Sequence, residues 1–375
     1  MKSLRRGSLL GSTGLNTMSD RKSKRMRTYV AIAVLATLTT LLAQGKVGAQ
    51  EESALTAGSE GRRAHIFPTV SKAAELADIG TSGPALAFHG GPVMTKAYAY
   101  AIFWVPSKLQ NGGSTSMSKW YQTVQNGFLY AYPGHGIDNN NTQYYSQTQI
   151  PQPFPLPPLT LTSYIANAGG LAGTYVDTSP YPASGCVDPA TPGNCITDAQ
   201  IQAEIQKVMT SQKWTGGLNN IFLLFTSSGE GSENPYGDLA YVQMCAYHSY
   251  FFSGKAPIIY ADIPYGNTSV CQAPGTPSPN RDPVADTALT AVSHELTEAI
   301  TDPELNAWYT SWGSEIGDLC AYNYGTNTWD SDQANQSWPT IELSQFGVVI
   351  GGGIQFFELQ EEYDNHAGGC VQIGP

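Results

Sequence analysis

Hydrophobic and polar positions along the chain alternate between strand-like runs and helical periods. Apolar runs at 97–105 and Ala256–Ile263 predict strands, and the unbroken run at Asn220–Thr226 predicts a buried one. Apolar residues at helical spacing predict helices over 116–130 and 198–211. Because strands and helices follow one another without a visible internal repeat, we expect one α/β or α+β domain with a mixed sheet.

The strongest helical pattern begins near Pro283. Asp282 can cap the N-terminus, and proline suits the first helical position. Apolar residues then recur at helical spacing as far as Ile300. Asp302 precedes Pro303, and the residue before a proline is disfavoured in the α region, so the helix should end there.

This helix carries the main candidate for chemistry. His294 and Glu298 are four residues apart and lie on one face, with Glu295 about 100° round the axis. The pentad H-E-x-x-E differs from the zinc-protease motif H-E-x-x-H by a glutamate at the last position. His294 and Glu298 form half of a metal site, and either Glu315 or Asp318 can supply a third ligand. The alternative is a hydrogen-bonded His294–Glu298 pair on a half-exposed helix.

The region between the first predicted helices has a different composition. Residues 132–196 are rich in Pro, Tyr, Asn and Gly, which predicts no long helix there. The same composition, which includes the proline-rich stretch 150–161, predicts an extended surface loop or an edge strand.

The N-terminal segment has the pattern of a secretory signal peptide. Residues 1–49 combine a basic lead, an apolar run at 30–43 and small residues before the end. The run is too short to span a bilayer comfortably, and no later run is long enough, so we expect no membrane span in the mature chain. Residues 50–85 are predicted to be a linker or pro-segment, with the ordered domain over 86–375.

The net charge of the chain without its leader bears on which partners it can bind. Residues 1–49 hold nine of the 19 basic and one of the 30 acidic residues, which leaves residues 50–375 with a formal charge of −19. Bulk electrostatics therefore argue against a nucleic-acid or anionic-membrane partner.

All six cysteines follow the leader, and an even count in an exported protein favours disulfides. Fifteen pairings are possible, and we predict that nearest neighbours pair: Cys186–Cys195, Cys245–Cys271 and Cys320–Cys370.

A family resemblance appears around the helix. The run SHELTEAITDPELNAWY at 293–309, followed by EIGDLC at 315–320, resembles the signature of the EXORDIUM or phosphate-induced protein family of plants, which has bacterial relatives. Residues 245–248 and, more loosely, 89–92 extend the resemblance over most of 86–320. The resemblance implies an extracellular protein, and it implies no particular reaction.

The same helix resembles that of zincin metalloproteases. This resemblance implies a single zincin-like domain around a central H-E-x-x-E helix, stabilised by disulfides. His294 and Glu298 would bind a divalent metal, with zinc the first candidate, and Asp318 or Glu315 would complete the site. Glu295 would be the general base. A carboxylate in place of the second histidine lowers the Lewis acidity of zinc and opens the site to other divalent ions.

Two functions follow. The first is a secreted metal-dependent hydrolase, a zincin-like peptidase acting on a peptide or on cell-wall or extracellular-matrix material. In it, Glu295 deprotonates a metal-bound water, and Tyr309 or His248 stabilises the oxyanion. His248 has the alternative of being a strand histidine packed among aromatic neighbours. The second function is a non-catalytic extracellular cell-wall, signalling or binding protein of the EXORDIUM type, whose helix is structural or holds a metal only for stability.

Overall fold

The computed structural model places the described residues in one compact unit, residues 54–375. The predicted signal peptide lies outside the described residues. Within the described part of the chain, no helix is both long and apolar enough to cross a membrane. The described residues are 65–77, 85–325, 334–344 and 347–374, with the backbone alone at 337–344 and 347–354.

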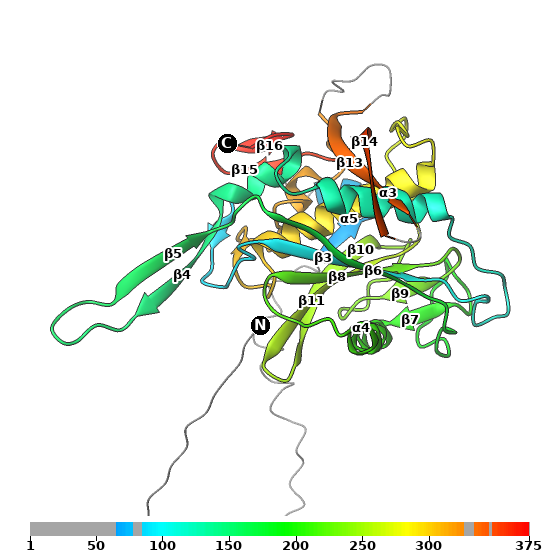
Figure 1. Ribbon diagram of the computed structural model, residues 1–375, viewed down its shortest axis with the longest axis horizontal. Coiled ribbons are helices and arrows are strands. Elements are labelled where there is room, and N and C mark those ends of the chain that lie inside the picture. The colour runs from blue at the N-terminus through cyan, green and yellow to red at the C-terminus, as the bar shows by residue number, and fades with distance from the viewer. Residues whose placement is uncertain (1–64, 78–84, 326–333, 345–346, 375) are drawn as a thin grey trace, which may run out of the picture. The chain divides into compact units, whose positions relative to one another are not determined.

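A six-stranded sheet forms the centre of the unit (Figure 1). Its strands are β1 (Ile66–Pro68), β3 (Ala97–Trp104), β6 (Gly169–Asp177), β8 (Asn220–Thr226), β10 (Met244–Ser253) and β11 (Ala256–Ile263). The strand order is β1-β10-β11-β8-β3-β6. The pairs that join β11, β8, β3 and β6 are parallel, whereas β10 is antiparallel to both β11 and β1. The predicted mixed sheet is confirmed.

Apolar side chains of the sheet alternate between two cores. On β8, Ile221, Leu223 and Phe225 belong to one core. Phe222 and Leu224 belong to the other. A strand that is covered on both faces is apolar at nearly every position, which explains the unbroken apolar run that predicted it.

Helices cover both faces of the sheet. They are α3 (Lys119–Ala131), α4 (Asp198–Gln212) and α5 (Pro283–Thr301). Ile201 of α4 packs in the same core as Phe222, whereas Val124 of α3 and Leu296 of α5 pack in the core that contains Leu223. The sheet therefore lies between α4 on one side and α3 with α5 on the other (Figure 1).

The helix α5 begins and ends where the sequence predicts. The Asp282 carboxylate accepts a hydrogen bond from the Ala285 backbone N–H at 3.1 Å, and Pro283 occupies the first turn. Asp302 is the residue after the helix. Every residue from Ala285 to Thr301 is buried, so the expectation of a half-exposed helix is wrong. Alanine, serine and threonine are frequent on α5, and their small side chains let neighbouring elements approach closely.

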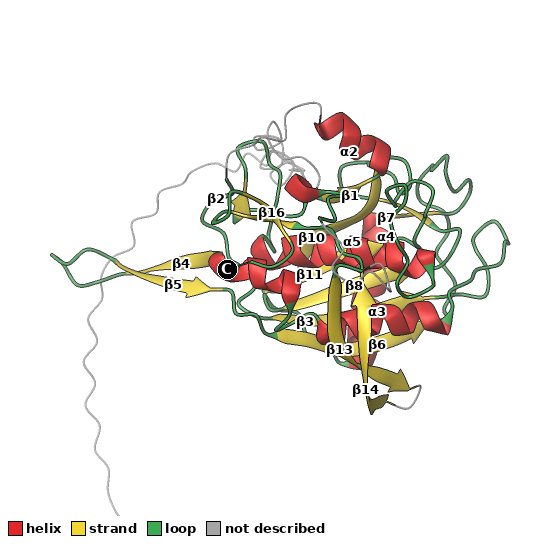
Figure 2. Cartoon of the chain, turned by 90° about the horizontal axis from the view of Figure 1, so that it is seen from above, coloured by secondary structure: helices red, strands yellow, loops and turns green. Residues whose placement is uncertain are grey.

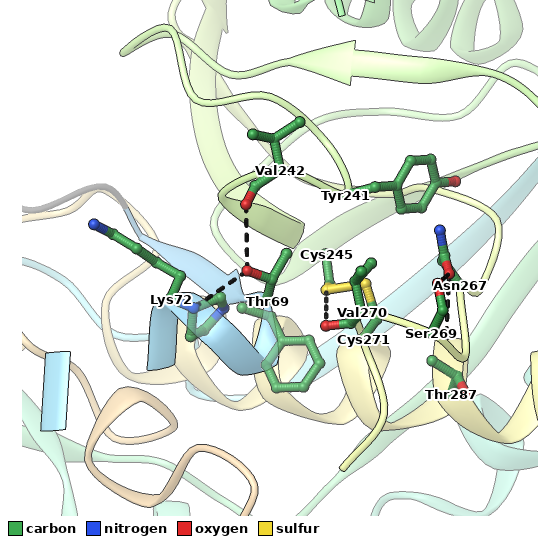
Figure 3. Close-up of a disulfide and its surroundings, with 12 residues drawn as sticks. Thr69, Lys72, Tyr241, Val242, Cys245, Asn267, Ser269, Val270, Cys271 and Thr287 are labelled. Atoms are coloured by element: carbon green, nitrogen blue, oxygen red, sulfur yellow. Dashed lines mark hydrogen bonds between the residues drawn. A yellow bond between two sulfur atoms is a disulfide. The ribbon is translucent and has the colours of Figure 1, made fainter. Parts of the chain in front are cut away.

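Part of the segment expected to be a linker has regular secondary structure. The expectation of a linker up to residue 85 is wrong for 66–77, which form β1 and the helix α2 (Val70–Ala77). Phe67 of β1 pairs with Ala246 of β10. Thr69 then donates a hydrogen bond to the Val242 carbonyl at 3.3 Å (Figure 3). Removal of residues 50–85 as a pro-segment stays a prediction.

A two-stranded hairpin carries the proline-rich stretch. It consists of β4 (Tyr145–Ile150) and β5 (Leu159–Tyr164), and it extends away from the central sheet in both views (Figures 1 and 2). Gln149 and Thr160 hydrogen-bond across one face. At the tip, the Phe154 side chain is 99% exposed. The stretch therefore lies at the surface, as expected, and turns between two paired strands.

The smaller elements complete the fold. The paired strands are β2 (Ala87–Phe88) with β12 (Trp308–Tyr309), β7 (Cys195–Thr197) with β9 (Gly231–Glu233), β13 (Gln336–Ser344) with β14 (Gly347–Phe357), and β15 (Glu362–Asp364) with β16 (Gly369–Val371). Two 3-10 helices are η1 (Gly136–Gln143) and η2 (Asp318–Cys320).

All three predicted disulfides are present. They are Cys186–Cys195, Cys245–Cys271 and Cys320–Cys370. Figure 3 shows the second bridge, which lies beside the segment that follows β1. The third ties η2 to β16 and so holds the Glu315–Asp318 loop to the C-terminal strands. The predicted disulfide-stabilised α/β fold is confirmed.

Candidate functional site

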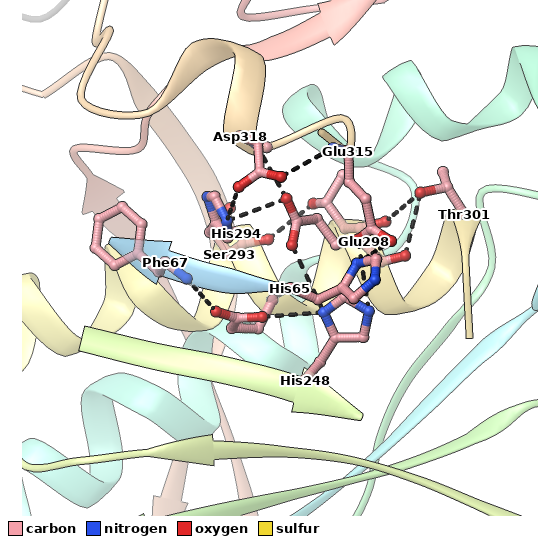
Figure 4. A network of polar contacts seen from close by, with 12 residues as sticks. His65, Phe67, His248, Ser293, His294, Glu298, Thr301, Glu315 and Asp318 are labelled. Carbon is pink, nitrogen blue, oxygen red and sulfur yellow. Dashed lines mark hydrogen bonds and ion pairs between the residues drawn. The ribbon is translucent and has the colours of Figure 1, made fainter. Parts of the chain in front are cut away.

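The H-E-x-x-E residues of α5 lie in the interior of the protein, where His294, Glu295 and Glu298 are all 0% exposed. Figure 4 shows His294 and Glu298 within a network of polar contacts. The His294 Nε2 atom lies 3.1 Å from Glu298 Oε1, as the four-residue spacing predicts. A buried carboxylate is costly unless it is paired, protonated or bound to a cation. The polar groups around these three residues therefore decide what the site can do.

The loop after α5 brings two more carboxylates back to the helix. The Asp318 backbone N–H donates to Glu298 Oε1 at 3.0 Å, and Asp318 Oδ1 lies 3.9 Å from His294 Nε2. Asp318 Oδ2 accepts from the Glu315 backbone N–H at 2.9 Å, which fixes the loop. A Cβ atom at Gly317 would lie 2.7 Å from His294 Nδ1, so the close approach of this loop requires glycine.

The strand β10 contributes His248 to the same cluster. Its Nδ1 atom lies 3.1 Å from Glu295 Oε2 and 3.5 Å from Glu298 Oε2. Its Nε2 atom lies 3.5 Å from Glu315 Oε2. The His248 ring therefore points toward α5 and the carboxylates (Figure 4).

Three further residues of the cluster were missed by sequence reasoning. His65 precedes β1, and its Nδ1 atom contacts Glu315 Oε1. The Gln360 amide lies 3.0 Å from His294 Nδ1, and Glu362 is buried on the adjoining strand β15. A signal for His65 was its position directly before Ile66 and Phe67, two apolar residues with high strand propensity within the segment expected to be a linker.

Tyr309 lies at the edge of the cluster. It lines a narrow gap with His65, Leu305 and Gly313, and this gap leaves no room for a water molecule. Small-molecule sites usually enclose about 300–1,000 Å³, so the gap is not such a site. The Tyr309 ring stacks on His89, with the ring centroids 3.6 Å apart. The structure thus brings six of the seven predicted site residues together in the cluster and places Tyr309 beside its member His65.

Burial and mutual charge set the protonation of the cluster. Burial lowers the pKa of His294, but the charge of Glu298 outweighs it and raises that pKa to about 10. Burial likewise lowers the pKa of His248, and its hydrogen bonds to Glu295 and Glu298 raise it to about 9. Burial alone would raise the pKa of the Glu298 carboxyl group, but the two imidazolium charges hold it below its ordinary value.

The other carboxyl groups shift in the opposite direction. Burial, with the charge of Glu298, raises the pKa of Asp318 to about 8. Burial and the charge of Glu298 also raise the pKa of Glu315 well above its ordinary value, and burial raises that of Glu295. In the cation-free protein, protons therefore neutralise most of these carboxylates. A divalent cation would displace those protons and do the same.

The donor set fits a divalent cation. One ligand atom from each of His294, Glu298 and Asp318 lies within 4.8 Å of the others. Imidazole nitrogen and carboxylate oxygen are ligands that zinc takes in proteins, and they also suit other first-row divalent ions. Glu315 belongs to a different grouping, with His65 and His248. On geometry, Asp318 is the better candidate for third ligand of the α5 site.

Part of the chain is similar to a curated plant protein. The chain is 29% identical over 160 residues to Protein EXORDIUM-like 3 of Arabidopsis thaliana, in an alignment covering 36% of this chain and 45% of that protein. The chain thus matches a little under half of that relative's length. No protein-family model matches the chain. No solved structure matches it either.

This similarity supports the relation to the EXORDIUM family over part of the chain. The three disulfides fit an extracellular protein, because disulfides persist in oxidising compartments, and the similarity is consistent with that location. The zincin-like assignment stays a prediction.

Proposed function

We propose that the protein is an extracellular, non-catalytic protein of the EXORDIUM type that binds a cell-wall or other matrix component. The supporting observation is the burial of Glu295, the residue that a zincin-like hydrolase would use as its base. Glu295 Oε1 accepts from the Phe67 backbone N–H at 2.7 Å, and Oε2 lies 3.1 Å from His248 Nδ1. A general base must reach the water or substrate that it deprotonates. Here protein groups contact both oxygens of a side chain that is 0% exposed.

The buried cluster has a structural role in this proposal. His294, Glu298 and Asp318 bind a divalent cation, with zinc as the first candidate. When bound, the cation supplies positive charge that neutralises the two carboxylates and links α5 to the loop that carries Asp318. Ligands that are assembled only in the folded chain make the binding free energy a contribution to folding. Metal binding would therefore stabilise the protein without turnover.

The proposed extracellular location rests on the disulfides and on the predicted signal peptide. An exported chain passes through an oxidising compartment, which the disulfides fit. Residues 1–49 would be removed as the signal peptide during export.

Two exposed tryptophans support the binding role. Trp120 and Trp312, which are 52% and 64% exposed, offer flat apolar surfaces for stacking on sugar rings of a wall polymer.

The metal content of the purified protein tests the cation role. We expect at least about one equivalent of zinc or another divalent ion by elemental analysis, and a lower content in the His294→Ala/Glu298→Ala double variant. Adding a chelator should lower the melting temperature of the wild type more than that of the double variant. A metal-free wild type whose melting temperature is insensitive to added zinc would contradict the cation role.

Sedimentation with insoluble cell-wall polysaccharide tests the binding role. We expect the wild type to sediment with the polymer, and a Trp120→Ala/Trp312→Ala variant to sediment less. A Phe252→Ala variant is the matched control, since Phe252 is an exposed aromatic residue on β10. Equal amounts of all three proteins in the pellet would show that Trp120 and Trp312 do not contact the polysaccharide. If the wild type is absent from the pellet, the protein does not bind this polysaccharide.

A secreted metal-dependent hydrolase is the second candidate. The observation that favours it is the arrangement of His294, Glu298 and Asp318, whose ligand atoms lie within 4.8 Å of one another. A peptide-library screen of the wild type and a Glu295→Gln variant separates the two functions. Turnover by the wild type that disappears in Glu295→Gln, at unchanged metal content, would favour the hydrolase. Absence of turnover in both proteins supports the non-catalytic role.

A further inference from the structure

We propose that the cluster holds a second divalent cation, bound by His65, His248 and Glu315. This inference rests on the proposed function, in which the first cation lies at His294, Glu298 and Asp318. The two sets of ligands share no residue. The second set joins the N-terminal strand β1 to β10 and to the loop after α5.

The spacing of the three side chains fits one cation. Their ligand atoms all lie within 4.8 Å of one another. The His65 Nδ1 atom contacts Glu315 Oε1, and His248 Nε2 lies 3.5 Å from Glu315 Oε2. Ligands about 2.1 Å from a tetrahedral zinc ion are roughly 3.4 Å apart. Small side-chain adjustments would therefore bring all three to one ion (Figure 4).

A backbone hydrogen bond places His65 and His248 opposite each other. The His248 backbone N–H donates to the His65 carbonyl at 3.3 Å, which continues the β1–β10 pairing by one residue. The two rings lie with their centroids 5.3 Å apart and at 65° to each other. Both side chains are buried, as is Glu315. Two imidazoles held beside a buried carboxylate form a mixed ligand set and not merely a group of acidic residues.

Glu295 has a positioning role in this arrangement. A histidine that binds a metal through one ring nitrogen usually donates its other N–H to a carboxylate, which fixes the tautomer and the ring orientation. His248 Nδ1 lies 3.1 Å from Glu295 Oε2, which leaves Nε2 toward Glu315 and the cation. The glutamate that resembles a general base in the sequence thus orients a ligand. Its contact with the Phe67 N–H also joins the site to β1.

The two sites differ in how deeply their ligands are buried. The side chains of His65, His248 and Glu315 are 3% exposed or less, whereas the side chain of Asp318 in the other site is 16% exposed. A cation needs an entry path as well as ligands. We therefore expect the His294 site to exchange its cation faster than the His65 site.

Zinc stoichiometry tests the proposal. The protein is stripped of metal, titrated with Zn²⁺, dialysed and analysed for zinc. We expect about two equivalents in the wild type, and about one in His65→Gln, in Glu315→Gln and in His294→Gln. His366→Gln is the matched control, because His366 is exposed and belongs to none of the ligand groups, and it should keep both. Circular dichroism checks that each variant is folded, and Glu315→Gln provides a near-isosteric test if His65→Gln is not.

Each other result has a distinct meaning. About one equivalent in the wild type, kept in His65→Gln and lost in His294→Gln, would overturn the second cation and leave the proposed function intact. Two equivalents kept in both His65→Gln and Glu315→Gln would overturn the assigned ligands. No zinc in the wild type would overturn both cations.

Discussion

The Glu295 carboxylate lies 3.1 Å from the His248 imidazole, and its other oxygen accepts a hydrogen bond from the Phe67 N–H. One buried side chain therefore connects α5, β10 and β1. Position 295 is the place where the resemblance of H-E-x-x-E to the zinc-protease motif predicts a catalytic base, and in this fold it joins three elements.

The first prediction separates the charge of Glu295 from its hydrogen bonds. Glu295→Ala leaves the buried Phe67 N–H without its acceptor and should lower the free energy of unfolding by about 3 kcal/mol. Glu295→Gln keeps an acceptor oxygen and should cost less than about 1.5 kcal/mol. Urea unfolding of both variants measures the difference. Equal losses would show that the hydrogen bond to β1 contributes little.

A second prediction concerns the glycine between the Asp318 loop and α5. A Cβ atom at position 317 would lie 2.7 Å from His294 Nδ1 and 3.0 Å from Glu298 Oε1. We expect Gly317→Ala to displace the loop, to lower the unfolding free energy by about 1–3 kcal/mol and to weaken zinc binding. Gly369→Ala is the control, because nothing lies within 4 Å of its added Cβ. Similar zinc affinities and stabilities for the two variants would contradict the close approach.

Asp262 gives a third prediction, on the pH dependence of stability. Ser232 Oγ donates to Asp262 Oδ2 at 2.5 Å, and burial raises the pKa of this carboxyl group to about 7. The folded protein therefore holds this proton more tightly than the unfolded chain, whose aspartates titrate near about 4. The stabilisation from the proton is present below about pH 4 and is lost as the pH rises toward about 7, by up to roughly 4 kcal/mol.

The Asp262→Asn variant tests this dependence, because its side-chain amide stays neutral throughout the range. It should be close to the wild type in stability near pH 4 and more stable than the wild type near pH 7. Urea unfolding of both proteins at both pH values measures this, and the difference between the two proteins removes the titration of groups that do not interact with Asp262. Glu75→Gln, at a side chain that is 66% exposed, is the control and should show no such change. An Asp262→Asn protein that is destabilised equally at both pH values would refute the prediction.

The disulfides provide a fourth prediction through the lengths of the loops that they close. Cys320–Cys370, Cys245–Cys271 and Cys186–Cys195 join residues that are 50, 26 and 9 positions apart. Loop entropy predicts losses of about 4, 3.5 and 2.5 kcal/mol, respectively, when each pair is replaced by alanine. Thermal unfolding of the three double variants gives their order. If the loss of stability is largest for the shortest loop, packing in the folded protein determines the effect of each disulfide, and the entropy of the unfolded chain does not.

Local signals in the sequence were sufficient to predict α5. The aspartate cap, the proline in the first turn and the helical spacing of apolar residues all act within a few residues. The same holds for β8, whose apolar run reflects burial on both faces. The i, i+4 geometry of His294 and Glu298 followed directly from the helix.

The remaining ligands depend on contacts between distant residues, which no local pattern encodes. His65 meets Glu315 only because β1 pairs with β10, and a three-residue strand gives a weak signal. The direction of His248 depends on which face of β10 lies against α5. β6 lies in the region that was expected to form a surface loop or an edge strand, and it is the last strand of the sheet. The sequence did not give its bounds, because its glycines interrupt the apolar run that marks a central strand.

The buried cluster has a consequence for the order of folding. It joins His65, at the start of β1, to Glu362 in β15, with its other members spread between them. Contacts between residues so far apart in sequence require large loops to close, and they form slowly. A nascent chain lacks Glu362 until β15 has been synthesised. We therefore expect assembly of the cluster, and with it metal uptake, to follow the synthesis of β15.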